Sequence, residues 1–177
     1  EMPQAVEGKM YGFQLWVNLP ARHKRMQPRY QEIASSQIPQ ILRPDGTRIR
    51  VIAGEVEGVP GAVRDIVADP TYLDVTLPPG SAFTQPVPAG HSAFAYVFEG
   101  QGAIGALPGQ EVRSTRLAVL GDGDLVEVHA GPQPVRFRLV SGKPRGEPIA
   151  RYGPFVMTTR EEIEEALSDL RNGTFVR

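Results

Sequence analysis

The chain has 177 residues, of which 41% are hydrophobic, and this is enough to bury one core without disulfides or a structural metal. It contains no cysteine, which excludes disulfides, thiolate metal sites and cysteine nucleophiles and favours a reducing compartment, so we expect a cytoplasmic location, or a nuclear one in a eukaryote. The formal net charge of −1 argues against direct binding of nucleic acid, and no apolar run reaches the roughly 18 residues that a membrane span requires.

Apolar and polar residues alternate with a period of two along most of the chain, a pattern typical of strands with one buried face. The 19 glycines and 17 prolines provide turns that separate these segments at intervals of roughly 8–12 residues. The sequence therefore predicts an all-β fold, either an antiparallel sandwich or a barrel. In chain order, the expected strands are residues 13–19, 48–53, 72–77, 93–98, 103–107, 116–120, 125–130 and 135–139.

Residues 21–46 lack any sustained period and are rich in proline, so we expect a linker arm rather than a second core. The basic run from Arg22 to Arg29 within this arm is interpreted as a solvated face, with contact to an acidic partner as the alternative.

One helix is predicted near the C-terminus. Thr158 and Glu161 have the spacing of a capping box, and Asn172-Gly173 provides a stop signal. We expect the apolar stripe of this helix to pack on the outer face of a sheet. The stripe consists of Ile163, Ala166, Leu167 and Leu170.

Two patterns that could carry chemistry are weak. Gly100-Gln-Gly102-Ala-Ile-Gly105 has the letters of a dinucleotide-binding fingerprint, but Pro108-Gly109 follows where a helix would have to begin, so the stretch is interpreted as a turn. His23, His91 and His129 stand singly, without the local spacing of a metal site, although they could still converge in space. The residues alone therefore assign no catalytic group and no cofactor-binding site.

The short strands and glycine turns resemble the cupin barrel (the double-stranded β-helix, or jelly roll), whose two motifs set metal-binding histidines and a glutamate at fixed distances from glycines. Gly80, Gly100, Gly123 and Gly131 match that glycine framework. None of the ligand positions holds the expected histidine or glutamate, and proline and alanine side chains offer no donor atom to a metal. The ligand positions fall on Pro86, Pro88, Ser92 or Ala93, and Pro134.

Three separated stretches resemble the pirin family of two-domain cupin proteins, in the family's order. They are Phe13-Gln-Leu-Trp-Val-Asn-Leu-Pro20, Pro28-Arg-Tyr-Gln31, and Gly153-Pro-Phe-Val-Met157 with the capped helix that follows. The resemblance covers nearly the whole chain and implies four parts. These are the last part of an N-terminal cupin barrel (1–20), a linker arm (21–46), a C-terminal cupin barrel without metal ligands (47–154), and a C-terminal helix and tail (155–177).

The resemblance also implies a metal site to which this chain contributes only one ligand. In pirins a non-haem iron is held in the N-terminal barrel by three histidines and a glutamate, and the glutamate belongs to a His-x-Glu-Met-Pro stretch. This chain begins Glu1-Met2-Pro3, so Glu1 matches the iron-binding glutamate and all three histidines would precede it. One carboxylate cannot hold Fe(II) usefully, so we expect Fe(II) in an intact parent protein and no cofactor in this chain alone.

Two classes of function follow from the resemblance. The parent protein could be an iron-dependent oxidoreductase, a dioxygenase of the quercetin 2,3-dioxygenase type, with this chain alone inactive. The alternative is an iron- or redox-responsive regulator that binds transcription factors (a transcription cofactor) or metabolic enzymes. A third interpretation is a small-molecule pocket inside the C-terminal barrel, but the sequence shows no group of polar residues that would line it.

The partners we expect are therefore an N-terminal cupin half and either a flavonol substrate or a regulatory protein, with neither nucleic acid nor membrane contacted directly. An unpaired strand at residues 13–19 would expose an apolar edge, so self-association into an oligomer is a further expectation.

Overall fold

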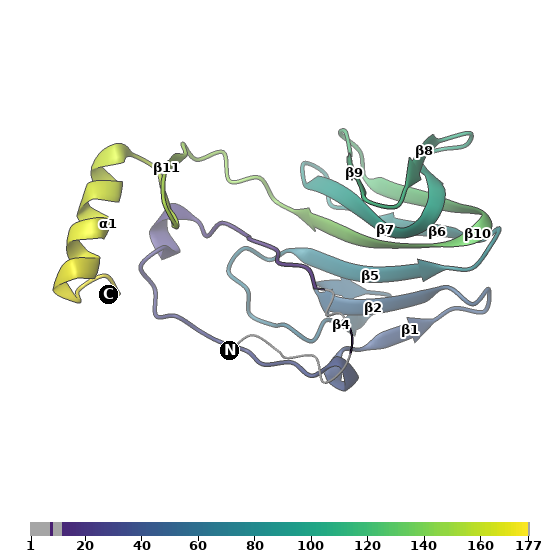
Figure 1. The fold of residues 1–177 in the computed structure, drawn as a ribbon, viewed down its shortest axis with the longest axis horizontal. Coiled ribbons are helices and arrows are strands. Elements are labelled where there is room, and N and C mark those ends of the chain that lie inside the picture. The colour runs from purple at the N-terminus through teal and green to yellow at the C-terminus, as the bar shows by residue number, and fades with distance from the viewer. Residues whose placement is uncertain (1–7, 9–11, 177) are drawn as a thin grey trace.

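The computed structural model describes residue 8 and residues 12–176, and most of its strands belong to one large antiparallel sheet (Figure 1). The strands are β1 (Gln40–Leu42), β2 (Arg48–Ala53), β3 (Glu55–Val56), β4 (Val59–Pro60), β5 (Thr71–Leu77), β6 (Ala82–Pro86), β7 (Ser92–Ile104), β8 (Gln110–Arg113), β9 (Arg116–Val119), β10 (Leu125–Gly142), β11 (Ala150–Tyr152) and β12 (Phe155–Met157). The helices are η1 (Ala21–His23), η2 (Ser35–Gln37) and α1 (Arg160–Asn172). The expected all-β fold with one C-terminal α-helix is confirmed.

The large sheet has the order β1-β2-β5-β10-β7-β8, with β6 also paired to β10 and β9 also paired to β7. The two long strands β7 and β10 pair along most of their length and bend together, so that the sheet curls around its own core (Figure 1). At the bend the register shifts between Ala130 and Val135 of β10, and Gly100 of β7 adopts a positive φ of 72°. A side chain on Gly100 would meet the carbonyl oxygen of Pro134, so glycine is required where the two backbones approach.

The core lies inside this curled sheet and consists of the inward-facing residues of its strands. Alternation along β5 leaves Leu73, Val75 and Leu77 with 0% exposure, as the period of two predicts. At the centre, the rings of Phe83 on β6 and Phe137 on β10 meet edge to face with centroids 5.6 Å apart. Burial of these apolar side chains stabilises the barrel, and because the sequence has no cysteine, no disulfide contributes.

The strand limits correct two sequence expectations. Residues 103–107 do not form a separate strand, because β7 continues through Gly100 to Ile104 before the chain turns. Likewise, 125–130 and 135–139 are two halves of the single strand β10. In both cases, glycines that punctuate the sequence mark bends inside a continuous strand rather than its end.

The C-terminal helix packs on the β11–β12 hairpin, not on the large sheet, at the end of the molecule away from β8 and β9 (Figure 1). Ile163 and Ala166 are buried there together with Met157 of β12 in a second, small core. The capping box is formed by Thr159 and Glu162, one residue later than expected, and Gly173 ends the helix in a left-handed conformation. No described helix is long and apolar enough to cross a membrane.

Residues 12–20 are not a strand in the structure, so the strand expected at 13–19 is wrong. These residues have no strand partner in the described part of the chain, and alternation alone cannot supply the ladder hydrogen bonds. Phe13 instead lies against the outer face of the large sheet, with its ring 5.0 Å from Phe98 and 5.7 Å from Tyr96. The expectation of an N-terminal barrel, of which 1–20 would be the last part, stays a prediction.

The arm connects the two ends of the molecule. Arg25 forms ion pairs with Glu165 and Asp169 of α1, and the amide of Ala21 donates to Glu147 at 2.9 Å. Further along the arm, Arg29 donates to the backbone oxygen of Asp65 beside the barrel at 2.9 Å. The basic run is therefore not wholly a solvated face, because Arg25 and Arg29 bind this chain's own acidic and backbone groups, whereas Arg22 is exposed. The arm then forms β1, the edge strand of the large sheet, which pairs with β2.

Candidate functional site

The interior of the barrel does not fit a metal centre. Three of the positions that match cupin ligand slots hold Pro86 at the end of β6, Pro88 in the following turn and Pro134 at the bend of β10, none of which carries a donor side chain. The fourth falls at the start of β7 on Ser92, which is exposed, or on Ala93, which has no donor atom. Around them, most of the buried side chains of β6 and β10 are apolar, Val126 and Val128 among them, and the buried polar ones are Gln85 and Ser141. Among the described residues, no group of three or more His, Asp or Glu side chains could hold a metal ion.

The structure places the three histidines in separate elements and does not bring them together as a metal site. His23 lies in η1, His91 begins the approach to β7 with its amide donating to the oxygen of Pro88 at 3.0 Å, and His129 lies within β10 opposite Ala82 and Ala103. Nδ1 of His23 and Nε2 of His129 are buried without a hydrogen-bond partner in the described part of the chain. Glu1, the residue predicted to bind iron, lies outside the described residues.

The stretch with dinucleotide-fingerprint letters is part of β7 and the turn after it, which confirms that no helix follows the glycines. Gly102 pairs with both Ala130 and Val112, so its backbone bonds belong to the sheet. No helix N-terminus is available here to receive a pyrophosphate.

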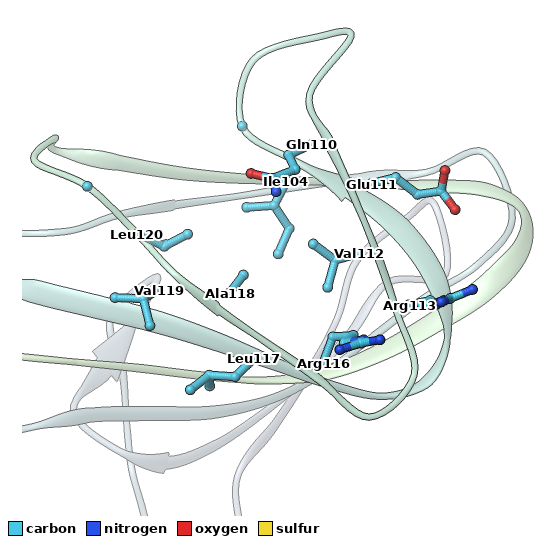
Figure 2. Close-up of a pocket in the computed structure, with 12 residues that line it drawn as sticks. Ile104, Gln110, Glu111, Val112, Arg113, Arg116, Leu117, Ala118, Val119 and Leu120 are labelled. Atoms are coloured by element: carbon cyan, nitrogen blue, oxygen red, sulfur yellow. The ribbon is translucent and has the colours of Figure 1, made fainter.

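A cavity of about 660 Å³ opens between β7, β8, β9 and the turn that follows β9. Figure 2 shows the side chains of Ile104, Val112, Ala118 and Leu120 pointing toward a common space. Ile104 and Val112 are buried, and Ala118 and Leu120 are partly buried. The polar and charged residues around this apolar floor are Gln110, Glu111, Arg113 and Arg116. The sequence predicted the strand 116–120 but gave no sign that β8 and β9 enclose a cavity.

A second cluster lies on the outer face of the large sheet, where arginines of β10 meet a carboxylate of β5. Asp74 is 2% exposed and pairs with Arg136 at 2.7 Å and with Arg138 at 2.8 Å. The guanidinium of Arg138 lies 5.0 Å from the ring of Phe13 and 5.3 Å from that of Phe98. The cluster therefore attaches residues 12–20 to the barrel.

The charged groups of this cluster are paired with one another, which marks it as a structural feature rather than a proton-transfer site. Hydrogen bonding to Asp74 raises the pKa of Arg136, because the carboxylate stabilises the charged guanidinium. Burial raises the pKa of the neighbouring Tyr72 hydroxyl. Both shifts hold the groups in the protonation states they already have at neutral pH, so neither becomes an acid or base near pH 7.

Comparison with known proteins gives a family match over the larger part of the chain. Residues 72–176 match the model of the pirin C-terminal cupin domain. The chain is 46% identical over 168 residues to a pirin-like protein of Arabidopsis thaliana, 42% identical over 175 residues to human pirin, and 41% identical over 179 residues to a putative quercetin 2,3-dioxygenase of Pseudomonas aeruginosa. These matches cover 91%, 97% and 98% of this chain.

The same comparisons show how much of each relative the chain spans. It corresponds to 53% of the Arabidopsis protein, 59% of human pirin and 62% of the Pseudomonas protein. A crystal structure of quercetin 2,3-dioxygenase from Acinetobacter baumannii superposes with a TM-score of 0.80 and 35% identity, over 90% of this chain and 55% of that one. The fold is a cupin barrel, and the chain belongs to the pirin family.

Proposed function

We propose that the protein to which this chain belongs is a metal-dependent dioxygenase that cleaves a flavonol such as quercetin, and that the barrel described here is its non-catalytic half. The observation that carries the second part is the mainly apolar interior of the barrel, where three of the four cupin ligand positions hold proline and no described group of side chains fits a metal. The names of the Pseudomonas and Acinetobacter relatives support the first part.

Within this proposal, Glu1 is the one residue of the chain assigned to the metal, as a ligand completed by histidines that precede it in the longer protein. Iron is the metal we propose, since a mixed histidine and carboxylate set with open positions suits Fe(II) and oxygen chemistry. In this proposal the described barrel supports the metal-binding half of the longer protein. The arm and the cluster around Asp74 on the outer face of the sheet hold residues 12–20 against the barrel.

The test compares the 177-residue chain with the protein extended by its natural upstream sequence. Each is supplied with Fe(II) anaerobically, desalted and assayed for bound iron, and then for oxygen-dependent loss of quercetin absorbance. We expect about one bound iron and turnover in the extended protein, and neither in the 177-residue chain. Turnover by the short chain would overturn the support role of this barrel.

A matched variant separates the metal role of Glu1 from general damage. Glu1→Gln in the extended protein should lower both iron content and turnover, whereas Glu7→Gln, in the same N-terminal segment, should change neither. Iron binding without any flavonol turnover would contradict the dioxygenase proposal. Iron-dependent capture of a protein partner by that same extended protein would then favour the regulatory alternative.

A further inference from the structure

We propose that the cavity between β7, β8 and β9 binds a small organic carboxylate with an apolar body, and that Arg116 binds its carboxylate group. This inference concerns the described barrel itself and depends on neither a metal nor flavonol turnover. The cavity volume, about 660 Å³, lies within the range of roughly 300–1,000 Å³ typical of small-molecule sites.

Strand register shows which of the charged residues faces the cavity. In the β7–β9 pair, Arg116 lies opposite Val97 and Ala118 opposite Ala95, and residues that face each other across a ladder share one side of the sheet. Val97 is 1% exposed and Ala95 is 0% exposed, so this side is the core side. Arg116 therefore lies on the same face as the apolar floor.

The same reasoning places the other charged residues on the opposite face. In the β7–β8 pair, Gly102 lies opposite the buried Val112, so the alternate residues Glu111 and Arg113 face outward. Figure 2 shows Glu111 pointing away from the space that the apolar side chains share. Arg116 is the cation on the cavity side, without a carboxylate on the same face of β8 to neutralise it.

Arg116 is also available for a ligand. In the described part of the chain its guanidinium forms no hydrogen bond and no ion pair, unlike those of Arg136 and Arg138, which are both paired with Asp74. An arginine offers a planar pair of donors that matches a carboxylate. An arginine beside an apolar floor selects an amphipathic anion over a neutral molecule or a strongly hydrated inorganic ion.

The far end of the cavity adds a neutral polar group. Gln110 pairs with Ile104 in the ladder and so lies on the cavity side of β8. Its amide can both donate and accept a hydrogen bond, which suits a hydroxyl or carbonyl on the apolar body of the ligand. The site therefore has an anion-binding end, an apolar floor and a neutral polar end.

The test uses 2-naphthoate as the probe and 2-naphthamide as its uncharged analogue, titrated into the 177-residue chain by calorimetry and by amide chemical shifts. We expect naphthoate to bind about tenfold more tightly than naphthamide, because a charge-assisted hydrogen bond adds to the shared apolar contact. The shift changes should fall on β8 and β9. Equal affinity for the two probes, or no binding of naphthoate at about 10 mM, would overturn the proposal.

Three variants assign the contact. Arg116→Gln should weaken naphthoate binding about tenfold and leave naphthamide binding within about twofold, whereas Arg113→Gln on the outward face should leave both within about twofold. Ala118→Phe should abolish binding of both probes by filling the cavity. Both arginines are exposed, so neither substitution threatens the fold. Equal losses in the two arginine variants, or shifts located at α1 and the β11–β12 hairpin instead, would refute the site.

Discussion

Arg136 donates two hydrogen bonds to Asp74, from Nε to Oδ1 at 3.0 Å and from Nη2 to Oδ2 at 2.7 Å. The carboxylate is on β5 and the guanidinium on β10, so the pair joins two central strands on the outer face of the sheet. Arg138 provides a second ion pair to the same carboxylate, and both arginines lie against the ring of Phe98. A carboxylate that is almost fully buried is stabilised in this way by two charges and by aromatic contact.

Replacing the carboxylate of Asp74 should destabilise the protein. We expect Asp74→Asn to lower the free energy of unfolding by about 2–3 kcal/mol, because it removes the buried counter-charge that two partly buried guanidinium groups share. The control is Glu99→Gln, whose carboxylate is 66% exposed and 3.9 Å from Arg136, and which should cost less than about 0.5 kcal/mol. Urea denaturation measures both. Equal effects would contradict the role assigned to Asp74.

The bend shared by β7 and β10 predicts that alanine destabilises the protein more at Gly100 than at Gly90. Gly100 and Gly90 have similar φ values of 72° and 78°, so alanine at either position strains the backbone by about 1–2 kcal/mol. A Cβ on Gly100 would also lie 2.0 Å from the oxygen of Pro134, whereas at Gly90 it would meet nothing within 4 Å. We expect Gly100→Ala to lower the melting temperature well beyond Gly90→Ala. Similar melting temperatures would mean that the bend is not tightly packed.

The cap of α1 predicts that the stability of this helix depends on pH. The hydroxyl and amide of Thr158 donate to the carboxylate of Glu162 and lower its pKa below the ordinary 4.5. The cap therefore contributes its full stability above about pH 4.5 and loses it as pH falls through the lower pKa of the folded state. Glu162→Gln should destabilise α1 by about 1 kcal/mol at pH 7 and by less at pH 3.

Hydrogen exchange of the α1 amides at both pH values checks this expectation. The control is Glu164→Gln, which removes an exposed contact 3.8 Å from Arg160 and should change exchange little at pH 7. A Glu162→Gln effect as large at pH 3 as at pH 7 would show that the carboxylate charge does not stabilise the cap.

The attachment of the arm to α1 predicts a local effect. Arg25 contacts Glu165 and Asp169, and its guanidinium lies 5.7 Å from the ring of Phe175. Arg25→Gln should speed exchange of the α1 amides roughly fivefold, equivalent to about 1 kcal/mol, while amides of β5 and β10 stay unchanged. Arg22→Gln, which removes an exposed arginine of η1, should have no such effect. Uniform acceleration throughout the chain would mean that Arg25 stabilises the whole protein instead.

Periodicity predicted the elements whose pairing partners lie inside the chain. In β2, Ile49 and Val51 face the core as the alternation requires, and each lies opposite a buried residue of β5. Residues 13–19 alternate just as clearly, yet a strand also needs a neighbour, and here Phe13 packs on aromatic rings instead. Alternation determines which side chains share a face but not whether a ladder forms.

The candidate sites were harder to predict, because they arise from contacts between distant residues. The sequence showed an arginine at the start of residues 116–120 but not that it would face a cavity closed by β8. Asp74 was visible as an outward residue of its strand, yet its two partners lie more than sixty positions later. Both arrangements depend on the register between strands, and a local sequence pattern gives no information on that register.

The central position of β10 has a consequence for how the protein is made. This strand, Leu125–Gly142, pairs with β5, β6 and β7. Three strands that are synthesised earlier therefore lack this neighbour until β10 has been made. Such non-local pairing slows folding, because loop-closure entropy is lost before the contacts form. A nascent chain that stops before residue 142 exposes the open edges of β5 and β7 to other chains. Chaperone demand and aggregation during expression should therefore fall sharply once β10 has left the ribosome.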